Sequence, residues 1–453
     1  MIPEEFLERM RLYLGDGYDA FLDALEKPPV RAFRVTKKGD RDTVLRLCRN
    51  FSPAPVPYVP DGFYFSGEHI GHTPVHHAGG IYVQDPGAMA AVAATDISPG
   101  AAVLDLCAAP GGKSAQVAAL IGEGGFLLSN EYLPARAKTL VGNVERLGLR
   151  NVVVTSLDTA ALGEIYRSYF DVVLCDAPCS GEGMFRKNDR AVTEWSPDNV
   201  RLCTERQAAI LDNAAPLVAE GGILLYSTCT FSPEENEYTV HNFLCRHPEF
   251  VPVPPAPRVL PYTAPALHLP GIPEGHTEYC RRFYPHIAPG EGQFFAVLRK
   301  ENSGEKKTFL CKNNEKPLSK SDMQAVRSFL ADNINGAEHL SVRSVGRRAV
   351  LLPSDIPLPS CSLFSGGVNI GEVRGGRVVP HHQLFSAYGT AWKRQVSLSE
   401  EDERIGAYLH GEEIPAGGAT EGVYAVLYEG MATGGGKISG GRLKNYYPKG
   451  LRE

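Results

Sequence analysis

The stretch "AAVLDLCAAPGGKSAQVAALIG", residues 101–122, joins a short apolar run to a glycine turn and then to a helical pattern. A continuous apolar run of this length is typical of a strand buried on both faces, as in a parallel sheet. Gly111 and Gly112 let the backbone of the turn approach a ligand closely. The helix that we expect to begin near Lys113 presents free N–H groups to the same space. The stretch therefore predicts a strand, a ligand-binding turn and a helix.

Apolar runs and helical patterns alternate beyond this stretch. Further runs are "GFLLSNE" (125–131), "NVVVTSLD" (151–158), "FDVVLCDAP" (170–178) and "GGILLYSTCT" (221–230), with helical patterns at 134–147 and at 198–218. This alternation predicts an α/β fold, in which a doubly wound, mostly parallel sheet is covered by helices on both faces. The segment "IAPGEGQFFAVLRK" (287–300) looks like a hairpin arm that closes the sheet with an antiparallel edge.

Changes of composition divide the chain into four predicted parts. Residues 1–74 read as a small α/β cap, because two short helical patterns precede the proline- and aromatic-rich "FSPAPVPYVPDGFYF" (51–65). Residues 75–300 hold the doubly wound sheet. After the polar segment "RKENSGEKKT" (299–308), residues 301–380 read as a small α+β module and residues 381–453 as a glycine-rich module with tight turns.

Composition and charge limit the possible classes of protein. The chain has 453 residues, 43% of them hydrophobic and 22% charged, and no apolar run reaches the 20 or so residues of a membrane span. Ten cysteines without a disulfide-like framework indicate a reducing compartment, so we expect a cytoplasmic protein. The net charge of -6 argues against binding nucleic acid through bulk charge but allows a local basic face. Candidates for such a face are Arg186, Lys187, Arg190, Arg281, Arg282, Arg347, Arg348, Arg442, Lys444, Lys449 and Arg452.

An acidic residue follows each of three successive predicted strands. Glu131 is expected near a ribose, where a carboxylate accepts hydrogen bonds from both hydroxyls. Asp158 either meets an adenine amino group or caps the next helix. Together with Asp176, these acids favour a nucleoside site at the carboxyl edge of the sheet. The G-x-G-x-x-G and G-x-x-x-x-G-K-[ST] spacings are absent, which disfavours a dinucleotide site and a phosphate loop.

Three motifs stand in order along the predicted sheet: "CAAPGGK" (107–113), "DAPCSGEG" (176–183) and "STCT" (227–230). With them the chain resembles the NOL/NOP/Sun family of RNA cytosine-5 methyltransferases, and most of all its bacterial ribosomal-RNA enzymes. The segment "GRLKNYYPKGLR" (441–452) is similar to the end of a PUA-like RNA-binding domain of the bacterial members. One departure is Gly87, where the family often carries a serine, and we expect it to be neutral for catalysis.

The resemblance implies a class I (Rossmann-like) methyltransferase domain, flanked by an RNA-binding cap and a PUA-like RNA-binding module. It implies S-adenosylmethionine as the cofactor and RNA as the partner, with 16S ribosomal RNA or the assembling 30S subunit expected. The residues that it assigns to cofactor binding are Cys107, Ala108, Ala109, Pro110, Gly111, Gly112, Lys113, Glu131, Asp158 and Asp176.

Methylation of carbon 5 of cytosine accounts for the two cysteines of the motifs, Cys179 and Cys229. A thiolate that adds to carbon 6 turns the ring into an enamine, and carbon 5 then attacks the methyl group. The Pro178–Cys179 pair matches the nucleophile of DNA cytosine methyltransferases. The RNA family resembled here instead uses the cysteine of "TCT", which implies that Cys229 is the nucleophile, that Cys179 helps release the product and that Asp176 faces ring nitrogen 3. The competing interpretation is that both are ordinary buried cysteines, as we expect for Cys175.

Other interpretations remain open from the sequence. A catalytically silent, RNA-binding ribosome-assembly factor on the same fold is one, and a methyltransferase that acts on another RNA, such as tRNA, is a second. An amino methyltransferase is disfavoured because the Asp/Asn-Pro-Pro-aromatic turn is absent. Arg186 and Lys187 follow the Cys179 loop and suit RNA phosphates. The histidines of "EHIGHTPVHH" (68–77) lack a Cys or acid pair to complete a zinc site, so we expect no metal.

Overall fold

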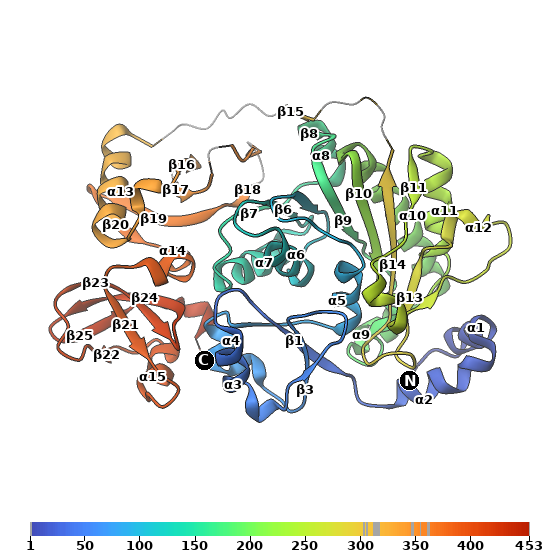
Figure 1. The fold of residues 1–453 in the computed structure, drawn as a ribbon, viewed down its shortest axis with the longest axis horizontal. Coiled ribbons are helices and arrows are strands. Elements are labelled where there is room, and N and C mark those ends of the chain that lie inside the picture. Colours follow the sequence, from blue (N-terminus) through green and yellow to red (C-terminus); the bar gives the residue numbers. More distant parts are fainter. Residues whose placement is uncertain are drawn as a thin grey trace.

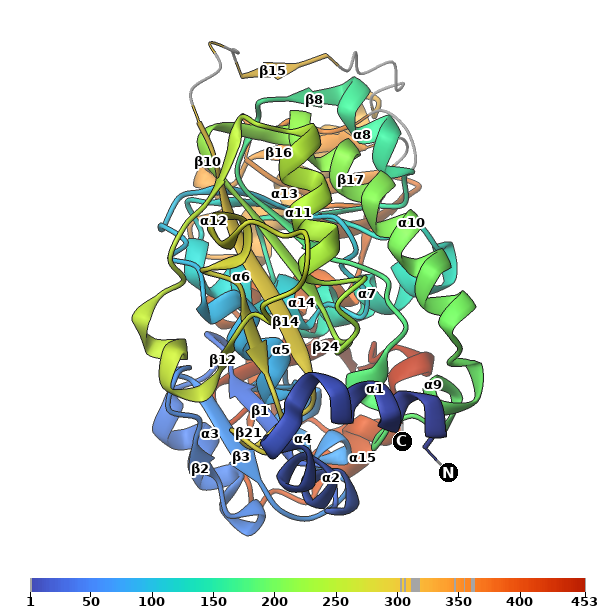
Figure 2. The ribbon, with the colours of Figure 1, turned by 90° about the vertical axis from the view of Figure 1, so that its right-hand side faces the viewer.

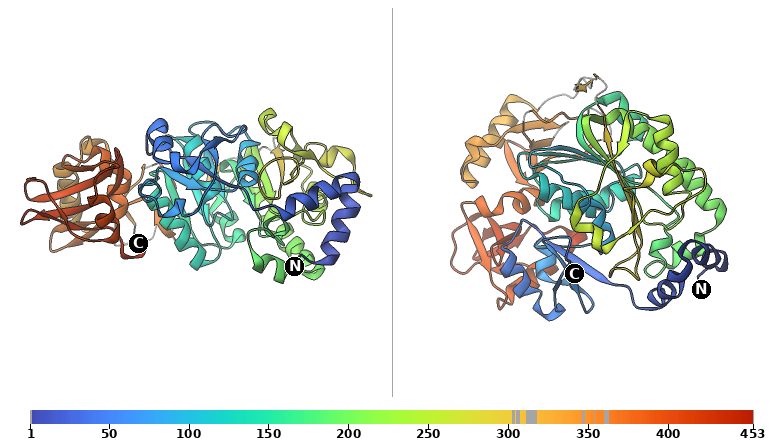
Figure 3. Two further views of the ribbon diagram at one scale, coloured as in Figure 1. Left: turned by 90° about the horizontal axis from the view of Figure 1, so that it is seen from below. Right: turned by 45° about the vertical axis from the view of Figure 1, so that its right-hand side comes forward.

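The computed structural model describes residues 2–301, 304, 307–310, 318–345, 348–353, 355–359 and 363–452. A large central sheet with its helices lies beside two smaller parts of the chain, which also pack against each other in a shared core cluster (Figure 1). The N-terminal helices lie at one end of the molecule and the C-terminal strands at the other (Figure 3). Among the described residues, no helix combines the length and apolar character needed to cross a bilayer.

The central sheet contains ten of the described strands. In spatial order they are β12 (Ala264–Pro265), β13 (Arg281–Phe283), β14 (Gln293–Lys300), β10 (Val218–Thr228), β9 (Phe170–Asp176), β5 (Ala102–Asp105), β6 (Phe126–Asn130), β7 (Val152–Thr155) and β18 (Leu363–Gly366), while β11 (Phe250–Pro252) also pairs with β14. Strands β7, β6, β5, β9 and β10 are parallel, and β14 runs antiparallel to β10. The predicted mostly parallel sheet and its antiparallel edge at 287–300 are confirmed.

Helices cover both faces of this sheet, as predicted. Alternate residues of each buried strand point to opposite faces, because side chains in a strand have a period of two. Val103 and Leu127 therefore join one core cluster, whereas Leu104 and Leu128 join the other. The first cluster includes residues of α5 (Pro86–Ala93), α6 (Gly112–Ile121) and α7 (Pro134–Arg146); the second includes residues of α8 (Thr159–Ile165), α10 (Pro197–Ala214) and α11 (Glu237–Arg246).

The N-terminal part packs against the loops that follow β9 and β10. Phe6 of α1 (Glu4–Leu14) and Phe21 of α2 (Tyr18–Glu26) share a core cluster with Phe185 and Phe231. Both helices lie beneath the central strands in Figure 2. The remaining elements of this part are β1 (Arg31–Val35), α3 (Arg41–Leu47), β2 (Ala54–Pro55), β3 (Gly62–Phe65), α4 (Pro74–His77) and β4 (Ile81–Val83), whose strands form one sheet.

The C-terminal part contains two more sheets. The first joins β16 (Val342–Val345), β17 (Arg348–Leu351), β19 (Val368–Arg374) and β20 (Arg377–Pro380) beside α13 (Lys320–Asn333) and α14 (His382–Tyr388). The second joins β21 (Gln395–Leu398), β23 (Gly422–Tyr428), β24 (Met431–Ser439), β25 (Arg442–Asn445) and β22 (Ile414–Pro415), with α15 (Arg404–His410).

Strand pairing links neighbouring parts of the chain. Strand β4 pairs with β1 across the predicted limit at residue 74, and β18 extends the central sheet from within residues 301–380. The predicted domain limits stay predictions. Four further short elements belong to the described structure: β8 (Tyr166–Arg167) pairs with β15 (Thr308–Phe309), α9 (Asp189–Glu194) follows the Cys179 loop, and α12 (Glu274–Thr277) lies beside α11.

Candidate active site

The turn between β5 and α6 is held from both sides. The backbone N–H of Ala108 donates to the Asn130 carbonyl at 2.8 Å, and Asn143 of α7 donates to the Pro110 carbonyl at 2.8 Å. Gly111 is the N-cap that precedes α6 and has φ 114°, a left-handed conformation that residues with a Cβ rarely adopt. The predicted ligand turn is therefore fixed in place before any ligand binds.

Two buried carboxylates beside this turn each carry an oxygen without a hydrogen-bond partner. Glu131 is 3% exposed; its Oε1 accepts from the Leu133 N–H, whereas its Oε2 has no such partner, although the Arg136 guanidinium lies 3.3 Å away. Asp105 accepts from the Ser114 hydroxyl at 2.7 Å, but its Oδ1 has no partner. Burial raises the pKa of Asp105 to about 7. Buried polar atoms are normally satisfied, so these oxygens suit the hydroxyl and amino groups of a nucleoside ligand.

Asp158 differs from these two acids. It is exposed, and its Oδ1 accepts from the Ala160 N–H at 2.9 Å as the N-cap of α8. The helix-capping alternative is therefore what the structure shows, and a contact with adenine stays a prediction.

Asp176 ends β9 and faces three polar side chains. The Lys113 ammonium lies 2.8 Å from Oδ2, and the Ser227 hydroxyl and Gln293 amide donate to Oδ1 at 2.7 and 3.3 Å. One third of the Asp176 side chain remains exposed, so a substrate can reach it. An ion-paired carboxylate of this kind accepts hydrogen bonds.

Cys179 and Cys229 meet in space, with their Sγ atoms 3.2 Å apart. They follow β9 and β10, which are adjacent parallel strands, so their ends lie at the same edge of the sheet. The hydrogen bond to the Cys229 sulfur, followed by burial, raises the pKa of the Cys179 thiol. Either sulfur can be the donor in their contact. Cys175 is fully buried in the core, which confirms the prediction for that residue.

The two cysteine loops are supported by buried side chains that the sequence analysis did not select. Asn236 bonds on both sides of Cys229: it accepts from the Thr228 hydroxyl at 2.6 Å and donates to the Thr230 carbonyl at 3.0 Å. Glu235, beside it, contacts the Cys179 loop. Their segment "SPEENEY" (232–238) reads as an ordinary polar helix start, and only its position after "STCT" connects it to the site.

Two residues predicted for a basic face have other roles. Arg186 donates to Glu291 at 2.9 Å, to the Gly290 carbonyl at 2.8 Å and to the Ala24 carbonyl of α2 at 2.9 Å. Its side chain is only 6% exposed, so the prediction that it binds RNA phosphates is wrong: its donors tie the N-terminal helix to the active-site loop.

Arg282 was also a candidate for a basic face, and this too is wrong because it forms a buried ion pair with Glu237. Lys187 pairs with Asp85 at 2.7 Å but keeps 22% exposure and stays a candidate for RNA contact. Arg347 lies outside the described residues.

At the position of Gly87, a residue with a side chain would collide with the neighbouring backbone. A Cβ at this position lies 2.7 Å from the Glu291 carbonyl oxygen, so this chain needs glycine here unless the neighbouring loop shifts. The departure from the family's serine therefore has a local steric cause, and its neutrality for catalysis stays a prediction.

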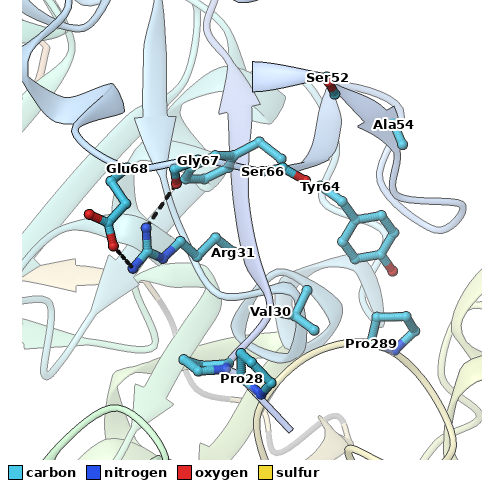
Figure 4. Close-up of a pocket in the computed structure, with 12 residues that line it drawn as sticks. Pro28, Val30, Arg31, Ser52, Ala54, Tyr64, Ser66, Gly67, Glu68 and Pro289 are labelled. Carbon is cyan, nitrogen blue, oxygen red and sulfur yellow. Dashed lines mark hydrogen bonds and ion pairs between the residues drawn. The ribbon is translucent and has the colours of Figure 1, made fainter. Parts of the chain in front are cut away.

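A hollow of about 570 Å³ opens in the N-terminal part (Figure 4). Pro28, Arg31 and Tyr64 line it together with Pro289, which directly precedes the Gly290 that accepts from Arg186. The Arg31 guanidinium donates to the Gly67 carbonyl at 2.9 Å within it. The hollow therefore neighbours the loop that carries Cys179.

Two contacts of histidine side chains lie apart from the predicted site residues. His77 contacts the Tyr447 hydroxyl of the C-terminal part at 2.9 Å. Among the described residues, the donor atoms of His241, Cys245 and His276 lie within 4.8 Å of one another. The Cys245 sulfur is 3.9 and 3.8 Å from the two ring nitrogens of His241 and so does not align with either lone pair alone. The expected absence of a metal stays a prediction.

The parallel sheet, the glycine turn after β5 and the acids at successive strand ends define a class I S-adenosylmethionine-dependent methyltransferase. Family models match residues 92–299 (16S rRNA methyltransferase RsmB/F), 2–86 (N-terminal domain of 16S rRNA methyltransferase RsmF) and 395–453 (methyltransferase RsmF PUA domain).

Relatives extend the match to nearly the whole chain. The ribosomal RNA small subunit methyltransferase F of Cronobacter sakazakii is 33% identical over 99% of this chain and 96% of the relative, and that of Vibrio parahaemolyticus is 30% identical over 99% and 97%. The crystal structure of a methyltransferase homologue from Pyrococcus horikoshii has a TM-score of 0.57 and 31% identity over 66% of this chain and 95% of that one. The chain therefore belongs to the RsmB/F family of 16S rRNA methyltransferases, and the predicted resemblance is confirmed.

Proposed function

We propose that this protein methylates carbon 5 of a cytidine in 16S ribosomal RNA, with S-adenosylmethionine as the methyl donor. The full-length relatives named for the small-subunit RNA and the matching PUA domain support an RNA substrate. The observation that carries the choice of carbon 5 is the contact of the Cys179 and Cys229 sulfurs at 3.2 Å, near Asp176. Methyl transfer to an amino group has no use for a pair of thiols, whereas carbon-5 methylation needs a sulfur nucleophile.

Cys229 is the nucleophile in this proposal. A thiolate attacks, not a thiol. In this proposal the Cys179 S–H donates to the Cys229 thiolate across the 3.2 Å contact and stabilises the anion there. Cys229 then forms a bond to carbon 6 of the pyrimidine, and the ring electrons make carbon 5 nucleophilic.

Asp176 and the buried acids position the two reactants. The Asp176 carboxylate, ion-paired with Lys113 and open to solvent, passes a proton from water to ring nitrogen 3 as the thiolate adds, and then accepts a hydrogen bond from the N–H formed there. Glu131 and Asp105 each offer the nucleoside of the cofactor an oxygen that has no hydrogen-bond partner in the described part of the protein. S-adenosylmethionine, when bound, supplies an electrophilic methyl group on sulfonium sulfur.

Cys179 completes the cycle. After transfer, carbon 5 carries both the methyl group and the original proton. Solvent water takes that proton, the C–H electron pair restores the double bond between carbons 5 and 6, and the Cys229 sulfur leaves as a thiolate that accepts a hydrogen bond from the Cys179 S–H. The proton at ring nitrogen 3 returns to solvent through Asp176. Cys229 therefore forms the covalent bond, and Cys179, which also supports the Cys229 thiolate, helps break it.

The RNA must present an open nucleotide. A base inside a helix cannot reach the thiols, so the target leaves its stack before reaction. We place flanking RNA along Lys187 and the hollow with Tyr64, whose ring can stack on a base. The reaction belongs in the cytoplasm, as the free thiols require a reducing compartment.

The test is to incubate the protein with methyl-labelled S-adenosylmethionine and either naked 16S rRNA, 30S subunits or tRNA, and then to digest each RNA to nucleosides. Label in 5-methylcytidine from 16S rRNA or 30S subunits is expected. Label in another nucleoside, or in tRNA alone, contradicts the proposal. Binding to 30S subunits without transfer indicates a silent assembly factor.

A further inference from the structure

Glu235 connects the two cysteine loops through its buried carboxylate. It lies between β10 and α11, and its side chain is fully buried. Neither the cofactor turn nor the two thiols requires an acid at this place. The inference that follows rests on the proposed function, because it concerns how the thiol pair is held for that reaction.

The carboxylate and its partner Gln207 hold both neighbours of Cys179. The Ser180 N–H donates to Glu235 Oε2 at 2.9 Å, and the Ser180 hydroxyl donates to Oε1. The Gln207 amide donates to Oε2 at 2.8 Å and also to the Pro178 carbonyl at 3.0 Å. The backbone on each side of Cys179 is therefore fixed through this carboxylate.

The same residue reaches the Cys229 loop. The Glu235 carbonyl accepts from the Tyr226 hydroxyl at 2.6 Å, three residues before Cys229. The Ser180 hydroxyl, which contacts the carboxylate, also lies 2.8 Å from the Thr230 hydroxyl, next to Cys229. Bonds to Glu235 thus connect residues that flank each cysteine.

Three donors from the described residues reach the carboxylate, which suits the ionised form. Burial raises the pKa of Glu235 to about 7, and the nearby acid Glu182 acts in the same direction. A glutamine can satisfy the site too. Its oxygen accepts from the Ser180 N–H and Gln207, and its NH₂ donates to the Ser180 hydroxyl, which then donates to Thr230.

We propose that Glu235 is the positioning residue of the thiol pair, which keeps the loops of Cys179 and Cys229 in the register that brings their sulfurs into contact. It acts through other residues and touches no reacting atom. Loss of its side chain leaves the Ser180 and Gln207 donors unsatisfied and frees the Cys179 loop to move.

The experiment compares Glu235→Ala, Glu235→Gln and the wild type in two measurements. The first is the methyl-transfer rate at saturating cofactor, alongside the Kd for S-adenosylmethionine. We expect Glu235→Ala to lower kcat by about 100-fold, as for a displaced reacting group, with the Kd unchanged. Glu235→Gln, which keeps the contacts, should retain most of the rate.

The second measurement reports the separation of the sulfurs directly. Diamide takes two electrons and two protons from a close pair of thiols and leaves a disulfide. Peptide mapping then gives the rate of the Cys179–Cys229 bond. We expect this rate to fall at least tenfold in Glu235→Ala and to stay near the wild-type value in Glu235→Gln, since the bond requires sulfurs within reach of each other.

Glu234→Ala is the matched control, because Glu234 is the adjacent acid but is 44% exposed and pairs with Arg9. It should change neither rate. Wild-type rates of transfer and crosslinking in Glu235→Ala overturn the proposal, and so does a Glu235→Gln variant that crosslinks normally but is as inactive as Glu235→Ala. If Glu235→Ala does not fold, Ser180→Ala provides the same two measurements. Wild-type protein that crosslinks but makes no 5-methylcytidine contradicts the proposed function and not this inference.

Discussion

Two regions lie at the same end of one sheet: the cofactor edge, which comprises residues 107–113 with Asp105 and Glu131, and the pair of thiols of Cys179 and Cys229. Their buried carboxylates differ in their hydrogen-bond partners. At the cofactor edge, Asp105 and Glu131 each keep a buried oxygen without a hydrogen-bond partner. At the thiol pair, the Glu235 carboxylate is saturated by three donors from the protein itself. Under the proposed function, a bound cofactor would supply the missing partners at the first region, whereas groups of the protein alone hold the loops of the two thiols.

The largest effect is expected from Cys229→Ala, which removes the nucleophile but no contact of the cofactor edge. Methyl transfer should fall by more than about 1,000-fold, because covalent catalysis is lost outright. The Kd for S-adenosylmethionine, measured by calorimetry, should not change. Cys245→Ala, at an exposed cysteine of α11, is the control and should remain active. A Cys229→Ala variant that still transfers methyl groups would show that the two regions are not divided as proposed.

Cys179→Ala is expected to separate bond formation from bond breaking. Cys229 still attacks, so methylated RNA should remain attached to the protein, while turnover falls by about 100-fold for loss of an acid–base group. The measurement is a denaturing gel that detects the covalent protein–RNA complex. If instead Cys229→Ala accumulates the complex and Cys179→Ala turns over normally, the two roles are reversed.

The sequence predicts the residues of the cofactor edge better than the buried residues that hold the two cysteine loops, and there is a physical reason for this difference. Residues 107–113 are contiguous, and the edge acids follow apolar runs, so the strand period and the parallel topology suffice to bring them together. Asp105 was missed because it stands inside an apolar run.

The sequence does not show which charged side chains are buried in the folded protein. Glu235 and Arg186 stand in polar segments, and whether such a side chain is solvated or enclosed depends on elements distant in the chain. Arg186 is enclosed by α2, more than 150 residues away in sequence. A local cluster of charges therefore cannot distinguish a basic surface from a set of internal ion pairs.

Glu131→Gln tests whether the cofactor edge depends on a ligand for its missing hydrogen bond. A carboxylate that accepts from ribose hydroxyls contributes roughly 1.5 kcal/mol or more, so the Kd for S-adenosylmethionine should rise by about tenfold. Crosslinking of Cys179 to Cys229 by diamide should be unchanged. An unchanged Kd, or a slower crosslink, would remove the distinction between the two regions.

The smallest effect is expected from substitution of Asp158. This residue follows a strand at the cofactor edge, but its side chain already caps α8, so it tests how far the cofactor edge extends. Asp158→Ala should lower the free energy of unfolding by about 1 kcal/mol, whereas Asp158→Asn, an equally good cap, should leave it unchanged. Chemical denaturation measures both, and the Kd for S-adenosylmethionine is measured in parallel. The contrary outcome is an Asp158→Ala variant that unfolds normally but whose Kd for S-adenosylmethionine rises as much as that of Glu131→Gln. The Asp158 carboxylate would then bind the cofactor, as proposed for Glu131, and would not stabilise the helix.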